Sequence, residues 1–174
     1  GIEVSVLCWG TDMLGGLVEQ KEGEKILKTL RQQGVNFIDT ADAYQNGNSE
    51  CLVGELIRDD RKRWILATKA GYPLPSDEKG PRLSRDRILK KFESSLERLG
   101  TDYVDIYYLH VIDPQTTIAE TVRTMGEVVE SGRARCWGFS NYYAWQISEM
   151  IRICDLEGIP RPVIAQTHYN IFKR

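Results

Sequence analysis

The stretch Val35-Asn36-Phe37-Ile38-Asp39-Thr40-Ala41-Asp42-Ala43-Tyr44 decides the fold of this chain. Its apolar first half is typical of a buried strand, and that strand ends abruptly in the acid Asp39. Tyr44 follows on polar sequence that is typical of a loop. In proteins built from parallel strands, residues just past the carboxyl end of a strand carry the chemistry. We therefore expect the other functional side chains of the chain to meet Asp39 and Tyr44.

Short apolar runs alternate with longer segments of helical periodicity along the whole sequence, which is typical of successive βα units. Strands are predicted at residues 4–9, 35–39, 64–68, 103–109, 134–139 and 163–167. Helices are predicted after the first five strands, and they end near residues 33, 58, 99, 132 and 157. The third helix repeats apolar residues at helical spacing, which predicts that its buried face consists of Ile88, Phe92, Leu96 and Leu99.

Residues that favour helix ends lie where these helices start and stop. Ser49 is expected to cap the second helix, and Ser140-Asn141 the fifth. Thr117 and Glu120 have the spacing of a capping box at the start of the fourth helix. Gly100 is expected to end the third helix in the left-handed conformation.

Six such units, without a change of composition between them, indicate one domain over residues 1–174. Their spacing suits either a (β/α)₈ barrel or a doubly wound sheet. No G-x-G-x-x-G pattern opens a helix after the first strand, and no G-x-x-x-x-G-K-[ST] loop is present. The sequence therefore favours the α/β class and a (β/α)₈ TIM barrel, in which function sits at the carboxyl ends of the strands.

Composition and charge argue against several classes of partner and site. The sequence is 41% hydrophobic and 28% charged, which is ordinary for a globular domain, and its formal net charge is -2. Without a basic stripe, this charge argues against nucleic acid, and no apolar stretch approaches the length of a membrane span. The cysteines are scattered without a C-x-x-C pair, at Cys8, Cys51, Cys136 and Cys154. They are typical of reduced thiols in a cytoplasmic protein, and not of disulfides or a zinc site.

Polar side chains that could take part in catalysis or binding occur at consecutive predicted strand ends. They are Asp39 and Tyr44, Lys69, His110, Ser140 and Asn141, and Gln166. Each alone has an ordinary structural interpretation as a loop cap, a solvated strand end or a satisfied core residue. Because the carboxyl ends of barrel strands meet on one rim, their joint occurrence there predicts one functional site.

This set of side chains predicts acid catalysis on a carbonyl group. A phenol is a poor acid at neutral pH, and a nearby ammonium strengthens it by stabilising the phenolate. Tyr44 would donate a proton to a developing alkoxide, with Lys69 beside it and Asp39 holding Lys69 in place. His110 would hydrogen-bond the same substrate oxygen. Such a site needs no metal, and the sequence offers no dense ligand cluster for one, but it needs a hydride source.

Several segments in this order resemble the aldo-keto reductase family, at residues 36–44, 47–50, 67–69, 99–105, 109–110 and 138–141. The resemblance covers essentially the whole chain. It implies a (β/α)₈ barrel that reduces a small aldehyde or ketone to an alcohol, with NADP(H) or NAD(H) as cofactor. It also implies Tyr44 as the acid/base, Lys69 and Asp39 as the residues that tune it, and His110 as the residue that orients the substrate.

The resemblance further implies which residues line the cofactor. They are Gly10, Thr11, Asp39, Ser140, Asn141 and Gln166. Gly10 and Thr11 lie in the loop after the first predicted strand. The hydroxyl and amide groups after the fifth strand and on the sixth are suited to hydrogen bonds with the carboxamide of a nicotinamide.

A complete barrel has eight strands, and the sequence supplies six. The resemblance places the residues for the adenosine 2′-phosphate in the last βα loop, so the sequence does not decide between NADP(H) and NAD(H). Three explanations stay open: part of a longer protein, a fragment, or a short protein completed by self-association or by another chain. The first two are favoured because no charge interrupts the sixth strand to protect its edge.

Two classes of function remain open. The first is a carbonyl reductase with Tyr44 as general acid. The second is a cofactor-binding regulatory or redox-sensing subunit, because aldo-keto-reductase-like subunits of potassium channels keep the same four residues. A chain that lacks the adenosine end of its site would instead be an inactive fragment of a reductase.

Overall fold

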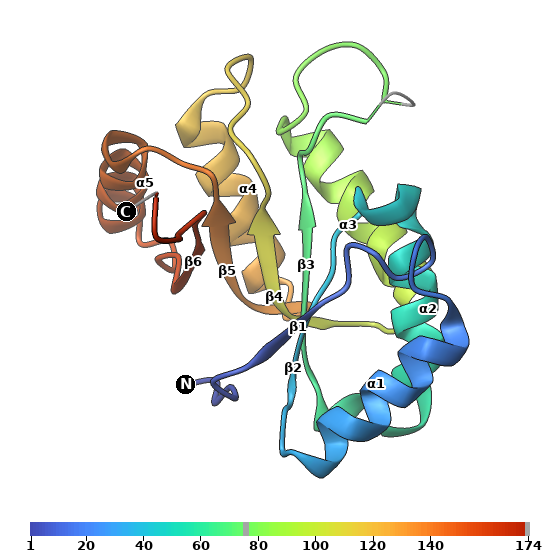
Figure 1. Ribbon diagram of the computed structural model, residues 1–174. Helices are drawn as coiled ribbons and strands as arrows, with labels where there is room; N and C mark the ends of the chain where they lie inside the picture. The colour runs from blue at the N-terminus through green and yellow to red at the C-terminus, as the bar shows by residue number, and fades with distance from the viewer. Residues whose placement is uncertain (75–76, 173–174) are drawn as a thin grey trace.

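In the computed structural model, which describes residues 1–74 and 77–172, the strands pair in parallel and in chain order (Figure 1). The described strands are β1 Cys8–Gly10, β2 Phe37–Asp39, β3 Ile65–Ala70, β4 Val104–Leu109, β5 Ala134–Ser140 and β6 Ile164–Gln166. The sheet curls, and within the described ranges β1 and β6 each pair with one strand only. This is a partial (β/α)₈ barrel, so the predicted fold class is confirmed.

Helices alternate with the strands and lie on the outer side of the curled sheet (Figure 1). They are α1 Gln20–Gln32, α2 Asn48–Ile57, α3 Arg85–Leu99, α4 Ile118–Glu130 and α5 Ala144–Glu157, with 3₁₀ turns η1 Tyr44–Gly47 and η2 Arg58–Arg63. Repeated crossovers of one hand place successive helices on the same face of the sheet, which leaves the other face toward the barrel interior. Across the part of the chain that the structure describes, no helix is long and apolar enough to span a membrane.

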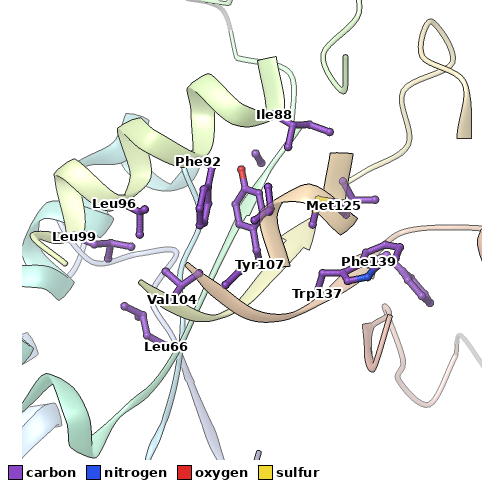
Figure 2. Close-up of a cluster of buried hydrophobic side chains, with 14 of the residues drawn as sticks. Leu66, Ile88, Phe92, Leu96, Leu99, Val104, Tyr107, Met125, Trp137 and Phe139 are labelled. Atoms are coloured by element: carbon purple, nitrogen blue, oxygen red, sulfur yellow. The ribbon is translucent and has the colours of Figure 1, made fainter. Parts of the chain in front are cut away.

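The main core lies between strands and helices, and Figure 2 shows its central part around Tyr107. The stripe predicted for α3 is buried there, with Ile88, Phe92, Leu96 and Leu99 each at most 3% exposed. The rings of Phe92 and Tyr107 pack with centroids 4.6 Å apart. Burying one such apolar side chain contributes about 1.5–3 kcal/mol, so the stripe holds α3 firmly against the sheet.

The parallel register brings the carboxyl ends of neighbouring strands level. Gly10 at the end of β1 pairs with Asp39 at the end of β2. Ser140 at the end of β5 pairs with Gln166 at the end of β6. Lys69 lies one residue before the end of β3. The polar strand ends therefore share one edge of the sheet, as the sequence predicts.

The first strand is shorter than predicted, and residues 4–7 lie outside it. The Ser5 N–H donates to Asn36 Oδ1, and the Ser5 hydroxyl donates to Leu7 O, so the chain bends instead of extending the ladder. Val6 and Leu7 are exposed. Their apolar character therefore does not reflect burial, which is why the sequence predicted too long a strand.

The predicted caps Ser49 and Ser140-Asn141 are wrong. Gly47, with a φ of 88°, is the N-cap of α2, and the Ser49 hydroxyl donates instead to Thr11 O at 2.7 Å. Tyr143 is the N-cap of α5. Asn141 likewise does not cap α5, because its Nδ2 donates to His110 O and to Ser140 Oγ.

The predicted capping box at α4 forms only in part. The Thr117 hydroxyl accepts from Glu120 N at 3.2 Å and caps the helix. The Glu120 carboxylate accepts from Arg85 N at the start of α3 and so joins two neighbouring helices. Gly100 ends α3 in the left-handed conformation, as predicted, with a φ of 60°.

Candidate active site

Lys69 is the centre of the predicted catalytic group. Its side chain is fully buried. Its Nζ donates hydrogen bonds to Asp39 Oδ2 at 2.5 Å, to Thr40 O at 2.9 Å and to Tyr44 Oη at 2.9 Å. An ammonium has three donors and no acceptor, so all its donors are used. The structure thus brings together Tyr44, Lys69 and Asp39.

The Lys69–Asp39 ion pair is almost entirely buried, with Asp39 only 4% exposed. Removing two charges from water is costly, and it is offset only by close contact and by hydrogen bonds to the remaining donors and acceptors. The Thr40 carbonyl supplies one such bond to Lys69. Asp39 Oδ1, by contrast, is buried with no hydrogen-bond partner among the described residues. The pair therefore keeps one acceptor free at the strand end.

Tyr44 is held on a strained turn. It opens η1, and the next two residues, Gln45 and Asn46, have φ values of 50° and 54°. Each non-glycine residue in this left-handed region costs about 1–2 kcal/mol, so surrounding contacts must hold the conformation. Gln45 Nε2 donates to Asp12 O at 2.7 Å, and Asn48 donates to another carbonyl of the same loop. The loop after β1 therefore secures the turn that presents Tyr44.

His110, directly after β4, completes the predicted group. Its ring lies 5.8 Å from the Tyr44 ring, between centroids, and the two rings are nearly perpendicular. Burial, followed by the positive charge of Lys69, lowers the pKa of His110 to about 4, so the imidazole is neutral at physiological pH. Its Nδ1 is buried without a hydrogen-bond partner. Because an unpaired acceptor costs less than an unpaired N–H, the proton is favoured on Nε2, which makes His110 a hydrogen-bond donor.

A buried cluster of hydroxyl groups, not predicted from the sequence, supports the end of β2. Thr11, Thr40 and Ser49 are each at most 1% exposed. Ser49 Oγ lies 2.9 Å from Thr11 Oγ1 and 3.1 Å from Thr40 Oγ1. Both N and Oγ1 of Thr11 donate to the carbonyl of Asp39. The cluster ties the ends of β1 and β2 to α2, and it uses the Thr11 hydroxyl inside the protein.

Tyr72 is a second residue that sequence reasoning missed. Its ring centroid lies 5.1 Å from that of His110, and the side chain is half exposed at the edge of the group. An aromatic residue just past a strand end was the available signal in the sequence. Within residues 1–74 and 77–172, no group of three His, Cys, Asp or Glu side chains is placed to hold a metal ion.

The predicted cofactor-binding residues continue along the same edge. Asn141, with a φ of 61°, donates from Nδ2 to His110 O at 3.1 Å and to Ser140 Oγ at 3.0 Å. Gln166 lies beside Ser140 in the register and is half-buried. The side chain of Asn141 thus connects the strand end of β5 to His110.

These residues fit a nicotinamide nucleotide in three respects. A Cβ on Gly10 would meet no atom within 4 Å, so the space above the end of β1 is open. The unpartnered Asp39 Oδ1 is suited to accept from a hydroxyl group. Ser140, Asn141 and Gln166 place amide and hydroxyl groups together, as a carboxamide requires.

Comparison with known proteins shows the family of this chain. The sequence model of the Aldo/keto reductase family matches residues 6–174. The chain is 40% identical to a "Probable voltage-gated potassium channel subunit beta" of Arabidopsis thaliana and 38% identical to one of Oryza sativa subsp. japonica. It is 36% identical to "Aldo-keto reductase YhdN" of Bacillus subtilis. These alignments cover all of this chain and 54%, 54% and 53% of the respective relatives, so the chain spans about half their length. The chain belongs to the aldo/keto reductase family.

Proposed function

We propose that this protein is an oxidoreductase that reduces an aldehyde or ketone to an alcohol, with Tyr44 as general acid and NADP(H), or else NAD(H), as cofactor. The observation that carries the proposal is the hydrogen bond from Lys69 Nζ to Tyr44 Oη at 2.9 Å. Family membership supports the reaction class.

The direction of that hydrogen bond sets the direction of proton transfer. Because Lys69 has no acceptor, its N–H donates to Tyr44 Oη, and the phenolic proton is left for another acceptor. A substrate carbonyl oxygen placed at Tyr44 would take that proton as it becomes an alkoxide. The Lys69 ammonium then stabilises the phenolate, and Asp39 keeps the ammonium charged and in position. A nicotinamide cofactor, when held by the residues along this edge, would supply the hydride for the carbonyl carbon.

His110 orients the substrate in this proposal. As a neutral imidazole with its proton on Nε2, it donates a hydrogen bond to the carbonyl oxygen without competing for the proton of Tyr44. Its low pKa keeps it in this form over the physiological pH range. Asn141 holds the backbone of His110 in place through the carbonyl of that residue.

Replacing Tyr44 with Phe tests the proposal directly. Tyr44→Phe removes the transferable proton and keeps the ring, so we expect turnover of 4-nitrobenzaldehyde with NADPH to fall by about 10² to 10⁴, the usual contribution of general acid catalysis. NADPH affinity, followed by protein fluorescence, should change little. Tyr103→Phe is the matched control, because Tyr103 directly precedes the amino end of β4, whereas the site lies at the carboxyl ends of the strands. Turnover close to that of the unmodified protein in Tyr44→Phe would refute the assignment.

A second candidate function is a regulatory or redox-sensing subunit that binds the cofactor and turns over slowly. The similarity to "Probable voltage-gated potassium channel subunit beta" proteins favours it. NADPH titration followed by fluorescence, together with steady-state reduction of an aldehyde panel, separates the two. Tight binding with slow or absent turnover favours the sensor. Absence of saturable binding favours an inactive fragment, or a chain that needs a complementing partner.

The proposed location is the cytoplasm. The thiols of Cys8, Cys51, Cys136 and Cys154 are all free. Free thiols are typical of a reducing compartment. Cell fractionation that recovers the protein in the cytosolic fraction would support this proposal, and recovery in a secreted fraction would contradict it.

A further inference from the structure

The loop between Asp39 and Tyr44 carries another acid, Asp42, that the proposed mechanism does not use. Its side chain is buried, and neither carboxylate oxygen accepts a hydrogen bond from any described residue. Its backbone N–H donates to the carbonyl of Lys69 at 3.1 Å. Asp42 is therefore fixed to the residue that holds the Tyr44 phenol. A buried carboxylate without hydrogen bonds is destabilising, so its presence at this position needs a reason.

Among the described residues, Lys91 on α3 is the cation that forms an ion pair with Asp42. Its Nζ lies 3.4 Å from Asp42 Oδ2, an ion-pair distance, and 2.7 Å from Asp77 Oδ1. The ion pair connects the loop of Asp42 to the body of α3, whose apolar stripe is buried in the core. Asp42 thus joins the turn before Tyr44 to a rigid helix.

The other charged and titratable groups that face Asp42 come from three elements. They are Glu50 on α2, Arg98 on α3 and Tyr107 on β4. Arg98 is held by Glu50, with Nε 2.7 Å from Oε2. Tyr107 Oη is buried without a hydrogen-bond partner, and in Figure 2 it points toward the helix layer. Of the described cations, Lys91 is therefore the one that pairs with Asp42.

The turn that follows explains why an anchor is needed on this side. Gln45 and Asn46 are both left-handed, so the segment would relax if its ends were free. The contact of Gln45 with Asp12 fixes the turn after Tyr44. Before Tyr44, the loop is joined to the helix layer by the ion pair between Asp42 and Lys91.

We propose that Asp42 is a positioning residue for Tyr44, because its ionised carboxylate, held by Lys91, fixes the turn that places the phenol on Lys69. Removing the charge weakens this anchor, and the strained turn relaxes. The consequence for turnover rests on the proposed function, whereas the movement of Tyr44 does not.

The ionisation of Asp42 gives the proposal a measurable pH. Burial, the largest cause, raises the pKa of Asp42 to about 6, with Lys91 opposing the rise and Glu50 adding to it. The environment of Tyr44 should therefore change as the pH falls through about 6. The pKa of His110 is about 4, so its titration is separated from this change.

The test is ¹³C NMR of the full chain labelled at tyrosine Cζ, with the Tyr44 signal identified by its absence in Tyr44→Phe. We expect the Tyr44 signal to shift with a midpoint near pH 6. In Asp42→Asn this step should vanish. In Lys91→Met the midpoint should rise, because Lys91 opposes the raised pKa of Asp42 more strongly than Arg98 does.

Asp86→Asn on the exposed face of the same helix is the matched control and should leave the step unchanged. A Tyr44 signal with no step near pH 6, or a step that persists in Asp42→Asn, would overturn the proposal. A step that vanishes only because Asp42→Asn fails to fold is recognised from the other tyrosine signals. Lys91→Met then provides the independent variant.

Kinetics supply a readout that a merely structural role would not move. At neutral pH, Asp42→Asn should lower kcat for 4-nitrobenzaldehyde roughly tenfold, less than the about 10²-fold that a 1 Å misplacement can cost. NADPH affinity should stay the same, and the decline of kcat below about pH 6 should disappear. An unchanged kcat with a normal NMR step would show that Tyr44 moves without consequence for catalysis. If the unmodified protein has no turnover, the proposed function fails while the NMR step still decides the role of Asp42.

Discussion

At the scale of single residues, the site depends on the fully buried Lys69. Its three N–H donors go to a carboxylate, a backbone carbonyl and a phenol, so one nitrogen atom, Nζ, fixes the positions of all three groups. Deleting the ammonium leaves Asp39 as a buried charge without a partner. Breaking a buried ion pair from one side costs more than removing both of its members.

We expect Lys69→Met to lower the free energy of unfolding by about 3–5 kcal/mol, because it leaves the Asp39 carboxylate buried and unpaired. Adding Asp39→Asn to that variant should recover roughly 1–3 kcal/mol, since the two sites are in direct contact. Urea denaturation of the two single variants and the double variant measures this coupling. If Asp39→Asn changed the free energy of unfolding equally in the unmodified protein and in Lys69→Met, a direct interaction would be contradicted.

At the scale of elements, α2 and α3 approach each other at Gly54. A Cβ at this position would overlap the backbone of Leu99, with 2.6 Å to its carbonyl carbon and 2.9 Å to its Cα. The backbone at the end of a buried helix cannot shift easily to relieve such an overlap. Gly126 on α4 is a contrasting case, because the nearest atoms to its Cβ would belong to a side chain, with Cγ2 of Ile159 at 2.9 Å.

The two glycines should therefore differ on substitution by Ala. Gly54→Ala should lower the free energy of unfolding by about 1–3 kcal/mol or more, through overpacking. In Gly126→Ala, the gain in helix propensity of about 1 kcal/mol should offset part of the strain, because the contact is with a side-chain methyl and not with backbone. Urea midpoints at equal m-values give the comparison. Similar losses in both variants would mean that the contact with the Leu99 backbone is not the cause.

The elements and the strand-end residues could be predicted because both depend on local pattern. The strand before Asp39 and the stripe of α3 were visible as apolar periodicity. Ser49 was misassigned because its side chain has a local interpretation as a cap, whereas its partner Thr11 lies 38 residues away. Asp42 was not singled out for a similar reason. Its role depends on Lys91, which only the folded chain brings near.

At the scale of the whole molecule, Asp42 and His110 give opposite dependences of stability on pH. The pKa of Asp42 is raised from 3.8 to about 6, so between these values the folded protein binds a proton that the unfolded chain does not. Its contribution to the free energy of unfolding therefore rises as pH falls, by up to about 3 kcal/mol. The pKa of His110 is lowered from 6.5 to about 4, so its contribution falls over nearly the same range by a similar amount.

The two effects nearly cancel in the unmodified protein, and substitution should separate them. Between about pH 7 and about pH 4.5, Asp42→Asn should lose roughly 2 kcal/mol more stability than the unmodified protein, because only the destabilising protonation linked to His110 remains. His110→Gln should lose roughly 2 kcal/mol less, since the stabilising protonation of Asp42 then acts alone. The exposed residues Asp86 and His168 provide controls as Asp86→Asn and His168→Gln. Urea denaturation at a series of pH values measures the curves, and parallel curves for all variants would contradict both assignments.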